Sequence, residues 1–241
     1  MDEQKDTSRM KAILVLAATL AFATSPFWSS GFGGFDPNSY PVPQVDPPVQ
    51  PAGYAFSIWS AIYIWLLASA GYGLVKRSDN PGWDATRWPL MISFVVGAPW
   101  ISVAILSPVW ATVMIWIMLG SALVALFRAP AEDRWLLQAP IALYAGWLTA
   151  ASFVATGLLG AGYGVIAGSL GWAWAMLLAA LAMGIAIQRN LPAQPFYGAA
   201  IVWALVAVAV RNLDGAIAVA ALALVGAAAV GWVALMAMRR P

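Results

Sequence analysis

Two sets of aromatic residues in this sequence are spaced as on one face of a helix and could together bind a ligand. Phe56, Trp59 and Tyr63 are spaced i, i+3 and i+7, and Tyr144 and Trp147 lie four and seven residues after a proline. Residues at these spacings share one face of an α-helix. Two aromatic ridges at the same depth could hold a flat apolar ligand by stacking. The alternative is an aromatic packing core that binds nothing.

The residue inventory excludes much catalytic and metal chemistry. The chain has no Cys and no His, so thiolate zinc sites, iron–sulfur clusters, histidine ligation of haem and Ser-His-Asp triads are absent. We therefore expect no catalytic residue, no metal site and no required cofactor. Whether the chain is an enzyme stays open, and a binding role is favoured because acid–base work would fall to Ser or Tyr.

Composition places the chain in a membrane. Apolar residues make up 62% of the 241 residues and charged residues only 9%, against about 25% charged in soluble domains. The net charge of +2 does not suggest a nucleic-acid partner.

Eight apolar stretches approach the length of about 20 residues that a helical span needs. Turn residues separate them, including Asn80-Pro81 and Ser107-Pro108. We predict an all-α integral membrane protein of about eight transmembrane helices, at 10–28, 53–75, 88–106, 109–127, 136–157, 164–188, 195–211 and 214–238.

The basic residues predict the orientation of these spans. With the N-terminus in the cytoplasm, eleven of the twelve Lys and Arg residues lie inside and only Arg211 lies outside. Both termini are then cytoplasmic, and we expect a multi-pass protein of a bacterial inner membrane. The alternative for the first span is a signal peptide, because Arg9 and Lys11 precede an apolar stretch and an Ala21-Phe22-Ala23 cleavage signal.

The predicted membrane interior holds no Asp, Glu, Lys or Arg at mid-depth, which argues against a proton-coupled transporter. It does hold many of the fourteen tryptophans. A buried indole N–H needs a hydrogen-bond acceptor, so we expect these rings to find partners in the bundle or to line a cavity. The interior tryptophans are Trp59, Trp65, Trp100, Trp116, Trp147, Trp172, Trp174 and Trp203.

Two further segments have a predicted role. The Pro- and Gly-rich loop 29–52 is either an extended lid over the outer face or a solvated connector. The sequence Gly164-Val-Ile-Ala-Gly168 at the predicted start of the sixth span is a G-x-x-x-G pattern, which favours a close helix crossing.

Two motifs resemble the TspO/MBR family, the tryptophan-rich sensory proteins related to the mitochondrial translocator protein. The segment Pro51-Ala-Gly-Tyr54-Ala-Phe56-Ser-Ile-Trp59-Ser-Ala-Ile-Tyr63 is similar to the entry of the family's second helix. The segment Pro140-Ile-Ala-Leu-Tyr144-Ala-Gly-Trp147 is similar to its fifth helix. Gly97 and Ser152 stand where the family has Asn, so the polar part of the family's pocket is altered.

The resemblance implies a TspO-like five-helix bundle in residues 1–160 with the outer loop 29–52, followed by three additional transmembrane helices in 161–241, as in a longer, divergent branch. It implies a pocket for a tetrapyrrole, such as protoporphyrin or haem, or for a sterol-like lipid. The residues expected to bind this ligand are Tyr54, Phe56, Trp59, Tyr63, Trp100, Tyr144 and Trp147.

The function predicted from these features is that of a membrane receptor or carrier for a flat hydrophobic ligand. The alternative is a structural or assembly subunit of a larger membrane complex. The expected partners are the hydrophobic small molecule, the lipid bilayer and, through a helix–helix contact, a second copy of the chain or another membrane protein.

Overall fold

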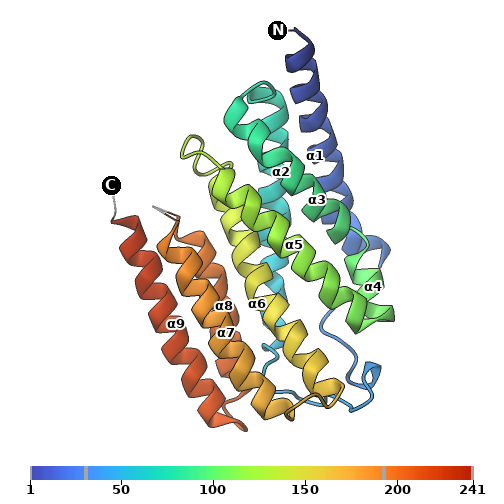
Figure 1. Cartoon of the computed structure of the whole chain (residues 1–241), viewed down its shortest axis with the longest axis vertical. Helices are drawn as coiled ribbons and strands as arrows, with labels where there is room; N and C mark the ends of the chain where they lie inside the picture. The colour runs from blue at the N-terminus through green and yellow to red at the C-terminus, as the bar shows by residue number, and fades with distance from the viewer. Residues whose placement is uncertain (1, 30–31, 192–193, 240–241) are drawn as a thin grey trace.

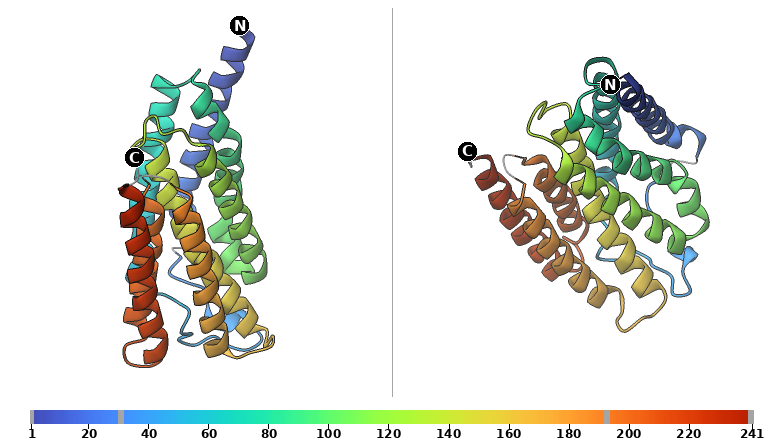
Figure 2. Two further views of the ribbon diagram at one scale, coloured as in Figure 1. Left: turned by 60° about the vertical axis from the view of Figure 1, so that its left-hand side comes forward. Right: turned by 45° about the horizontal axis from the view of Figure 1, so that its top comes forward.

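The computed structural model describes residues 2–29, 32–191 and 194–239, and these residues form helices and loops without a β-strand. The α-helices run alongside one another, and both termini lie toward the same end (Figures 1 and 2). They are α1 (Asp2–Trp28), α2 (Ile58–Lys76), α3 (Pro81–Gly97), α4 (Trp100–Leu106), α5 (Pro108–Arg128), α6 (Gln138–Gly162), α7 (Ser169–Arg189), α8 (Phe196–Arg211) and α9 (Ile217–Met238). Two short 3₁₀ helices, η1 (Pro37–Ser39) and η2 (Gly53–Ser57), lie between α1 and α2.

The prediction of an all-α, multi-pass membrane protein is confirmed. Seven helical segments of the described chain are long and apolar enough to cross a bilayer, with α3 and α4 together forming one of them. The remaining predicted span is α8, an apolar helix of 16 residues. At a rise of about 1.5 Å per residue it is shorter than a hydrocarbon core of about 30 Å.

Capping residues define the ends of two helices as the turn chemistry predicts. The side chain of Asn80 accepts a hydrogen bond from the backbone of Trp83, and Pro81 follows at the first helical position of α3. The Ser107 hydroxyl caps α5 in the same way, with Pro108 next in the chain. Because α3 begins at Pro81, it starts seven residues before the predicted 88, and its first turns lie in the segment predicted as a loop.

Proline affects the third and fifth spans differently. The third span is interrupted at Pro99, between α3 and α4, since a proline in a helix interior lacks the N–H and clashes with the preceding turn. Pro89 lies inside α3, which continues through it. Pro140 is the third residue of α6, where the backbone N–H would have no intrahelical partner in any case. It therefore leaves α6 continuous.

The predicted boundary between the fifth and sixth spans is wrong. Helix α6 continues to Gly162, and α7 begins only at Ser169. The G-x-x-x-G segment 164–168 therefore forms the loop between the two helices, where Gly164 and Ile166 both have positive φ. A close approach of α6 and α7 does exist nearby, since a Cβ at Gly160 would overlap the indole of Trp172.

Helix α6 is the central element of the bundle and packs against α2, α5, α7 and α8. Its contact with α8 is so close that a Cβ added at Gly146 would overlap the backbone carbonyl of Tyr197. Next to this crossing, the hydroxyls of Thr149 and Tyr197 lie 2.9 Å apart. Glycine and small polar residues thus bring the two helices together, as is usual in membrane bundles.

The end of the bundle that holds both termini is tied together by Asp133, in the loop between α5 and α6. Its carboxylate accepts hydrogen bonds from Arg77 Nε at 2.6 Å, after the end of α2, and from Trp83 Nε1 at 3.0 Å, in α3. The hydrogen bonds from Arg77 are the main reason that the pKa of Asp133 lies below its usual value. This carboxylate connects three segments of the bundle.

Candidate functional site

The loop between α1 and α2 closes the end of the bundle opposite to the termini (Figure 1). Three contacts fix its described part to the helices. The backbone N–H of Val42 donates to the carbonyl of Gly162 at 2.9 Å, and that of Ala52 to the carbonyl of Ala207 at 3.0 Å. Asn212 Nδ2 donates to the carbonyl of Pro48 at 2.9 Å, and Arg211 forms an ion pair with Asp46.

Two side chains of this loop are inserted into the bundle. Tyr40 is 5% exposed and Val49 is 3% exposed. They pack over glycines of α6, because a Cβ at Gly162 would overlap the Tyr40 ring and a Cβ at Gly157 would lie 3.3 Å from Val49. The loop is therefore a fixed lid rather than a solvated connector. Its residues 30–31, which include Gly31, lie outside the described residues.

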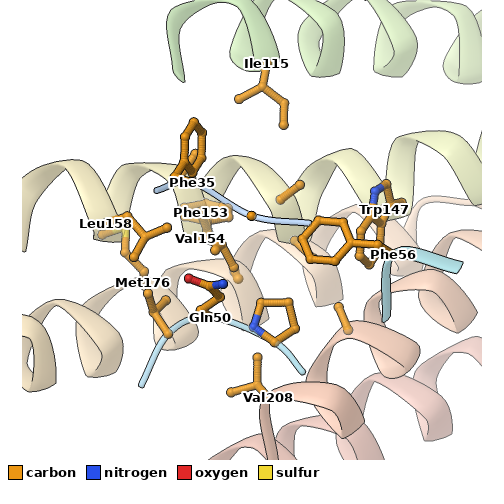
Figure 3. Close-up of a pocket in the computed structure, with 18 of the residues that line it drawn as sticks. Phe35, Gln50, Phe56, Ile115, Trp147, Phe153, Val154, Leu158, Met176 and Val208 are labelled. Atoms are coloured by element: carbon orange, nitrogen blue, oxygen red, sulfur yellow. The ribbon is translucent and has the colours of Figure 1, made fainter. Parts of the chain in front are cut away.

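A cavity of about 70 Å³, here called the lid cavity, lies beneath this loop. Its walls come from the lid, α2, α4, α5, α6, α7 and α8. Figure 3 shows the side chains around it, with Gln50 of the lid among apolar neighbours. Residues that line it include Phe32, Phe35, Val49, Gln50, Phe56, Trp59, Trp100, Ile115, Trp147, Phe153, Val154, Leu158, Met176, Ile201 and Val208.

A second cavity of about 330 Å³, here called the α1 cavity, lies on the other side of the same aromatic residues. Its distinct lining includes Phe22 and Phe27 of α1 and Ser60 and Tyr63 of α2. Phe27 is 89% exposed, so this cavity reaches the surface of α1. The two cavities share one wall, formed by Phe32, Phe56, Trp59, Trp100 and Ile115.

The two predicted aromatic ridges are in direct contact. The Phe56 and Trp147 rings meet edge to face with centroids 6.0 Å apart, and Trp59 meets Trp147 in the same way at 6.1 Å. Trp59 also stacks on Tyr63 at 5.2 Å. No gap for a flat ligand therefore exists between the ridges, and the cavities lie beside them.

Five of the seven predicted site residues line a cavity. Phe56, Trp59 and Trp100 line both cavities, Trp147 lines the lid cavity and Tyr63 lines the α1 cavity. The remaining two do not line either cavity.

Tyr54 is 45% exposed and packs against Trp203 of α8, with centroids 5.5 Å apart. Tyr144 is fully buried, and its hydroxyl lies 2.9 Å from that of Ser93. It supports the Phe22 and Trp59 rings from behind, at centroid distances of 5.7 and 6.3 Å.

Sequence reasoning missed the lining residues of the lid and of α7 and α8. Phe32, Phe35 and Gln50 belong to a loop that was expected to cover the site, and the aromatic pair within this loop was a usable signal. Met176 and Val208 lie in helices for which the motif gave no role. In a membrane helix, the sequence does not distinguish an apolar residue that lines a cavity from one that packs against a neighbouring helix.

Seven of the eight interior tryptophans either donate their N–H to a described residue or line a cavity, as the indole chemistry predicts, and Trp174 does neither. Five donate their N–H within the bundle: Trp65 to the carbonyl of Trp135, Trp100 to that of Ala111, Trp116 to the hydroxyl of Thr156, Trp172 to the carbonyl of Val165 and Trp203 to that of Ala55. Trp174 packs against the core. Trp59 and Trp147 are the two that line a cavity without such a bond to a described residue.

The site is apolar and uncharged. None of the described residues that line the two cavities is Asp, Glu, Lys or Arg. The described chain also holds no cluster of acidic side chains that could bind a metal ion. This arrangement can bind an apolar molecule by contact and stacking, and its few polar groups can orient that molecule.

Comparison with known proteins identifies the family. A family model described as TSPO-like protein matches residues 10–236. Comparisons with curated proteins and with solved structures give no match. The matched region extends past residue 160 into α9, so it includes the helices beyond the two motifs. The chain belongs to the TSPO-like protein family, as its resemblance to TspO/MBR proteins predicted.

Proposed function

We propose that this protein is a membrane receptor or carrier that binds a hydrophobic small molecule under the lid. The observation that carries the proposal is the lid cavity itself. A loop fixed to α6 and α8 covers a space walled by Phe56, Trp59, Trp100 and Trp147. Apolar clefts and cavities with few polar groups are the usual form of small-molecule sites.

Binding requires the lid cavity to enlarge. A volume of about 70 Å³ holds only about two molecules of water at the density of the liquid. The tetrapyrrole and sterol-like ligands that the family resemblance suggests are far larger. The shared wall offers the route, because displacing Phe32 or Phe56 joins this space to the α1 cavity of about 330 Å³.

The assembly-subunit alternative loses the support of the G-x-x-x-G pattern. Its helix–helix contact was expected from the G-x-x-x-G pattern, and residues 164–168 form a loop instead. The cavity favours ligand binding.

The proposed orientation follows the positive-inside rule. We place the end with both termini on the cytoplasmic side of a bacterial inner membrane. Lys76, Arg77 and Arg128 lie at or just beyond the helix ends there. The lid then faces the opposite side and covers the site from there. An apolar ligand can reach the site from the bilayer or from the lid face.

Tryptophan fluorescence tests the proposed function. Purified protein is titrated with protoporphyrin IX, with its dimethyl ester and with a fluorescent sterol. We expect saturable quenching or energy transfer with at least one probe, weakened in Trp59→Phe and Trp147→Phe. Trp110→Phe is the matched control, because Trp110 is 64% exposed and lines neither cavity. Linear quenching with every probe would refute the proposal.

A further inference from the structure

The described lid consists of two segments that are bonded to different helices. Residues 32–44, here called the leading segment, are bonded to α6, and residues 45–57, the trailing segment, are bonded to α8. In the described chain, one hydrogen bond joins the leading segment to a helix, from the Val42 N–H to the Gly162 carbonyl. Ring packing adds to this bond, including that of Tyr40 on Gly162. The leading segment is therefore held mostly by apolar contact.

The trailing segment is tied to one end of α8 by polar contacts along its length. The pairs of residues are Arg211 with Asp46, Asn212 with Pro48, Ala207 with Ala52 and Trp203 with Ala55. Trp203, Ala207 and Arg211 follow one another at intervals of four, so they share one face of the helix. Several contacts to the same face must break together before this segment can move.

Helix α8 is a firm support for the trailing segment. It packs against α6 and α9, and Gly146 of α6 lies so close to the Tyr197 carbonyl that a Cβ there would overlap it. The Tyr197 hydroxyl lies 2.9 Å from that of Thr149 in α6. These contacts connect the lid to the helices after residue 160, for which the two motifs give no role.

The two segments also differ in their buried polar groups. In the described lid, the buried side-chain atoms that lack a hydrogen-bond partner are Tyr40 Oη and Gln44 Oε1, and both belong to the leading segment. Tyr40 is 5% exposed and Gln44 is 6% exposed. A buried polar group without a partner costs free energy that hydration would recover. Closure of the leading segment keeps these two atoms from water, and its opening releases them.

We propose that the lid opens as a flap, in which the leading segment lifts from α6 while the trailing segment stays fixed on α8. Phe32 and Phe35 move with the leading segment. Phe32 belongs to the wall that the two cavities share, and Phe35 lines the lid cavity (Figure 3). Phe56 stays in place because it belongs to the trailing segment. Opening therefore joins the two cavities and uncovers them on the lid face. The inference rests on the proposed binding function and concerns the way to the site.

Hydrogen exchange of the protein without ligand tests the flap. Val42 and Ala52 form a matched pair, because each amide follows a proline and donates to a helix carbonyl, at 2.9 and 3.0 Å. After correction for intrinsic exchange rates, we expect the Val42 amide to be protected at least about tenfold less than the Ala52 amide. Equal protection of the two amides, or greater protection of Val42, would overturn the inference.

The hydroxyl of Tyr40 allows a second test. Tyr40→Phe keeps the ring on Gly162 and removes the unpaired group, so we expect the protection of Val42 to rise by about tenfold and that of Ala52 to stay unchanged. Tyr54→Phe is the matched control, because Tyr54 lies in the trailing segment and is 45% exposed, and we expect it to change neither amide. Unchanged protection of Val42 in Tyr40→Phe, or an equal rise at both amides, would contradict the flap.

Ligand kinetics connect the flap to entry into the site. With any probe that binds saturably, we expect Tyr40→Phe to slow association by about the factor by which it raises the protection of Val42, because the open form is less populated. Unchanged association despite increased protection would show that the ligand enters by another route. Failure of the exchange predictions refutes the flap and leaves the receptor or carrier function intact. Absence of saturable binding for every probe refutes that function, and the comparison of Val42 with Ala52 still decides the flap.

Discussion

The indole rings of Trp59 in α2 and Trp147 in α6 meet edge to face, with centroids 6.1 Å apart and an interplanar angle of 84°. This contact joins the two aromatic ridges that the sequence predicts. It also decides where a ligand can bind, because the rings fill the space between the helices. The cavities are left on either side of a shared aromatic wall.

The crossing of α6 and α8 predicts that Gly146 tolerates no side chain. In Gly146→Ala the new methyl group would overlap the carbonyl of Tyr197, and we expect a loss of about 1–3 kcal/mol from overpacking. Thermal unfolding in detergent, followed by helical circular dichroism, measures this loss. Gly71→Ala is the control, since nothing lies within 4 Å of a Cβ at Gly71 in α2. Equal melting temperatures in the two variants would contradict the described crossing.

The Asp133 cluster predicts a specific loss of stability in acid. The folded-state pKa of Asp133 lies below its ordinary value because Arg77 donates hydrogen bonds to it. Its contribution to stability is therefore complete above the unfolded-state pKa of about 4 and is lost as the pH falls through the lower folded-state value.

Replacing the carboxylate with an amide tests this effect. Asp133 has a φ of 55°, a conformation that Asn also adopts readily, so Asp133→Asn changes the charge without straining the backbone. We expect it to lose about 2 kcal/mol at pH 7 and to show a flatter stability profile below pH 4. Parallel profiles for the two proteins, measured as melting temperature against pH, would show that the cluster contributes nothing.

The lid tether at Asn212 predicts a local change in dynamics. Asn212→Ala removes the hydrogen bond to the carbonyl of Pro48, and we expect faster hydrogen exchange at the amides of Val42 and Ala52. Asn190→Ala is the control, because Asn190 ends α7 with a comparable bond to the carbonyl of Ala186 and does not touch the lid. Faster exchange in both variants or in neither would contradict the tether.

The proposed orientation predicts which loops are labelled from outside the cell. The sequence has no Cys, so single cysteines can be introduced at exposed loop positions. We expect a membrane-impermeant maleimide to label Val45→Cys in intact cells and to label Ala131→Cys only after permeabilisation. The reverse pattern would place the lid in the cytoplasm.

The helices were predictable where one local feature of the sequence is enough to indicate them. Apolar length identifies the spans, and the Ser107-Pro108 turn lies within two residues of the predicted start of the fourth span at 109. Asn80 caps α3, but the start of that span was predicted at 88, because apolar length and not capping set this boundary. The end of α6 was not predictable in this way. Its terminal glycines resemble a turn, yet Gly160 and Gly162 are helical, and the rings of Trp172 and Tyr40 pack on them. That packing is tertiary and leaves no local signal.

The residues of the candidate site were predictable from sequence only where they lie in a regular helix, because the helix face then sets the direction of the side chain. Trp59 and Tyr63 are four residues apart in α2 and share a helix face as expected, and their rings stack on each other. Tyr54 precedes α2 in the 3₁₀ helix η2, where residues two apart point in different directions. It packs against Trp203, 149 positions later in the printed sequence, and such a contact depends on the complete fold.

Filling the lid cavity tests the central claim most directly. Ala151 of α6 lines this cavity, and Ala151→Phe places a ring in a space of about 70 Å³. Ala182→Phe adds the same ring to α7 at an exposed position. Both variants and the wild-type protein are titrated with protoporphyrin IX dimethyl ester. We expect Ala182→Phe to bind as the wild type does and Ala151→Phe, still folded, to lose saturable binding. Unchanged affinity in Ala151→Phe would show that the ligand does not occupy the space beneath the lid.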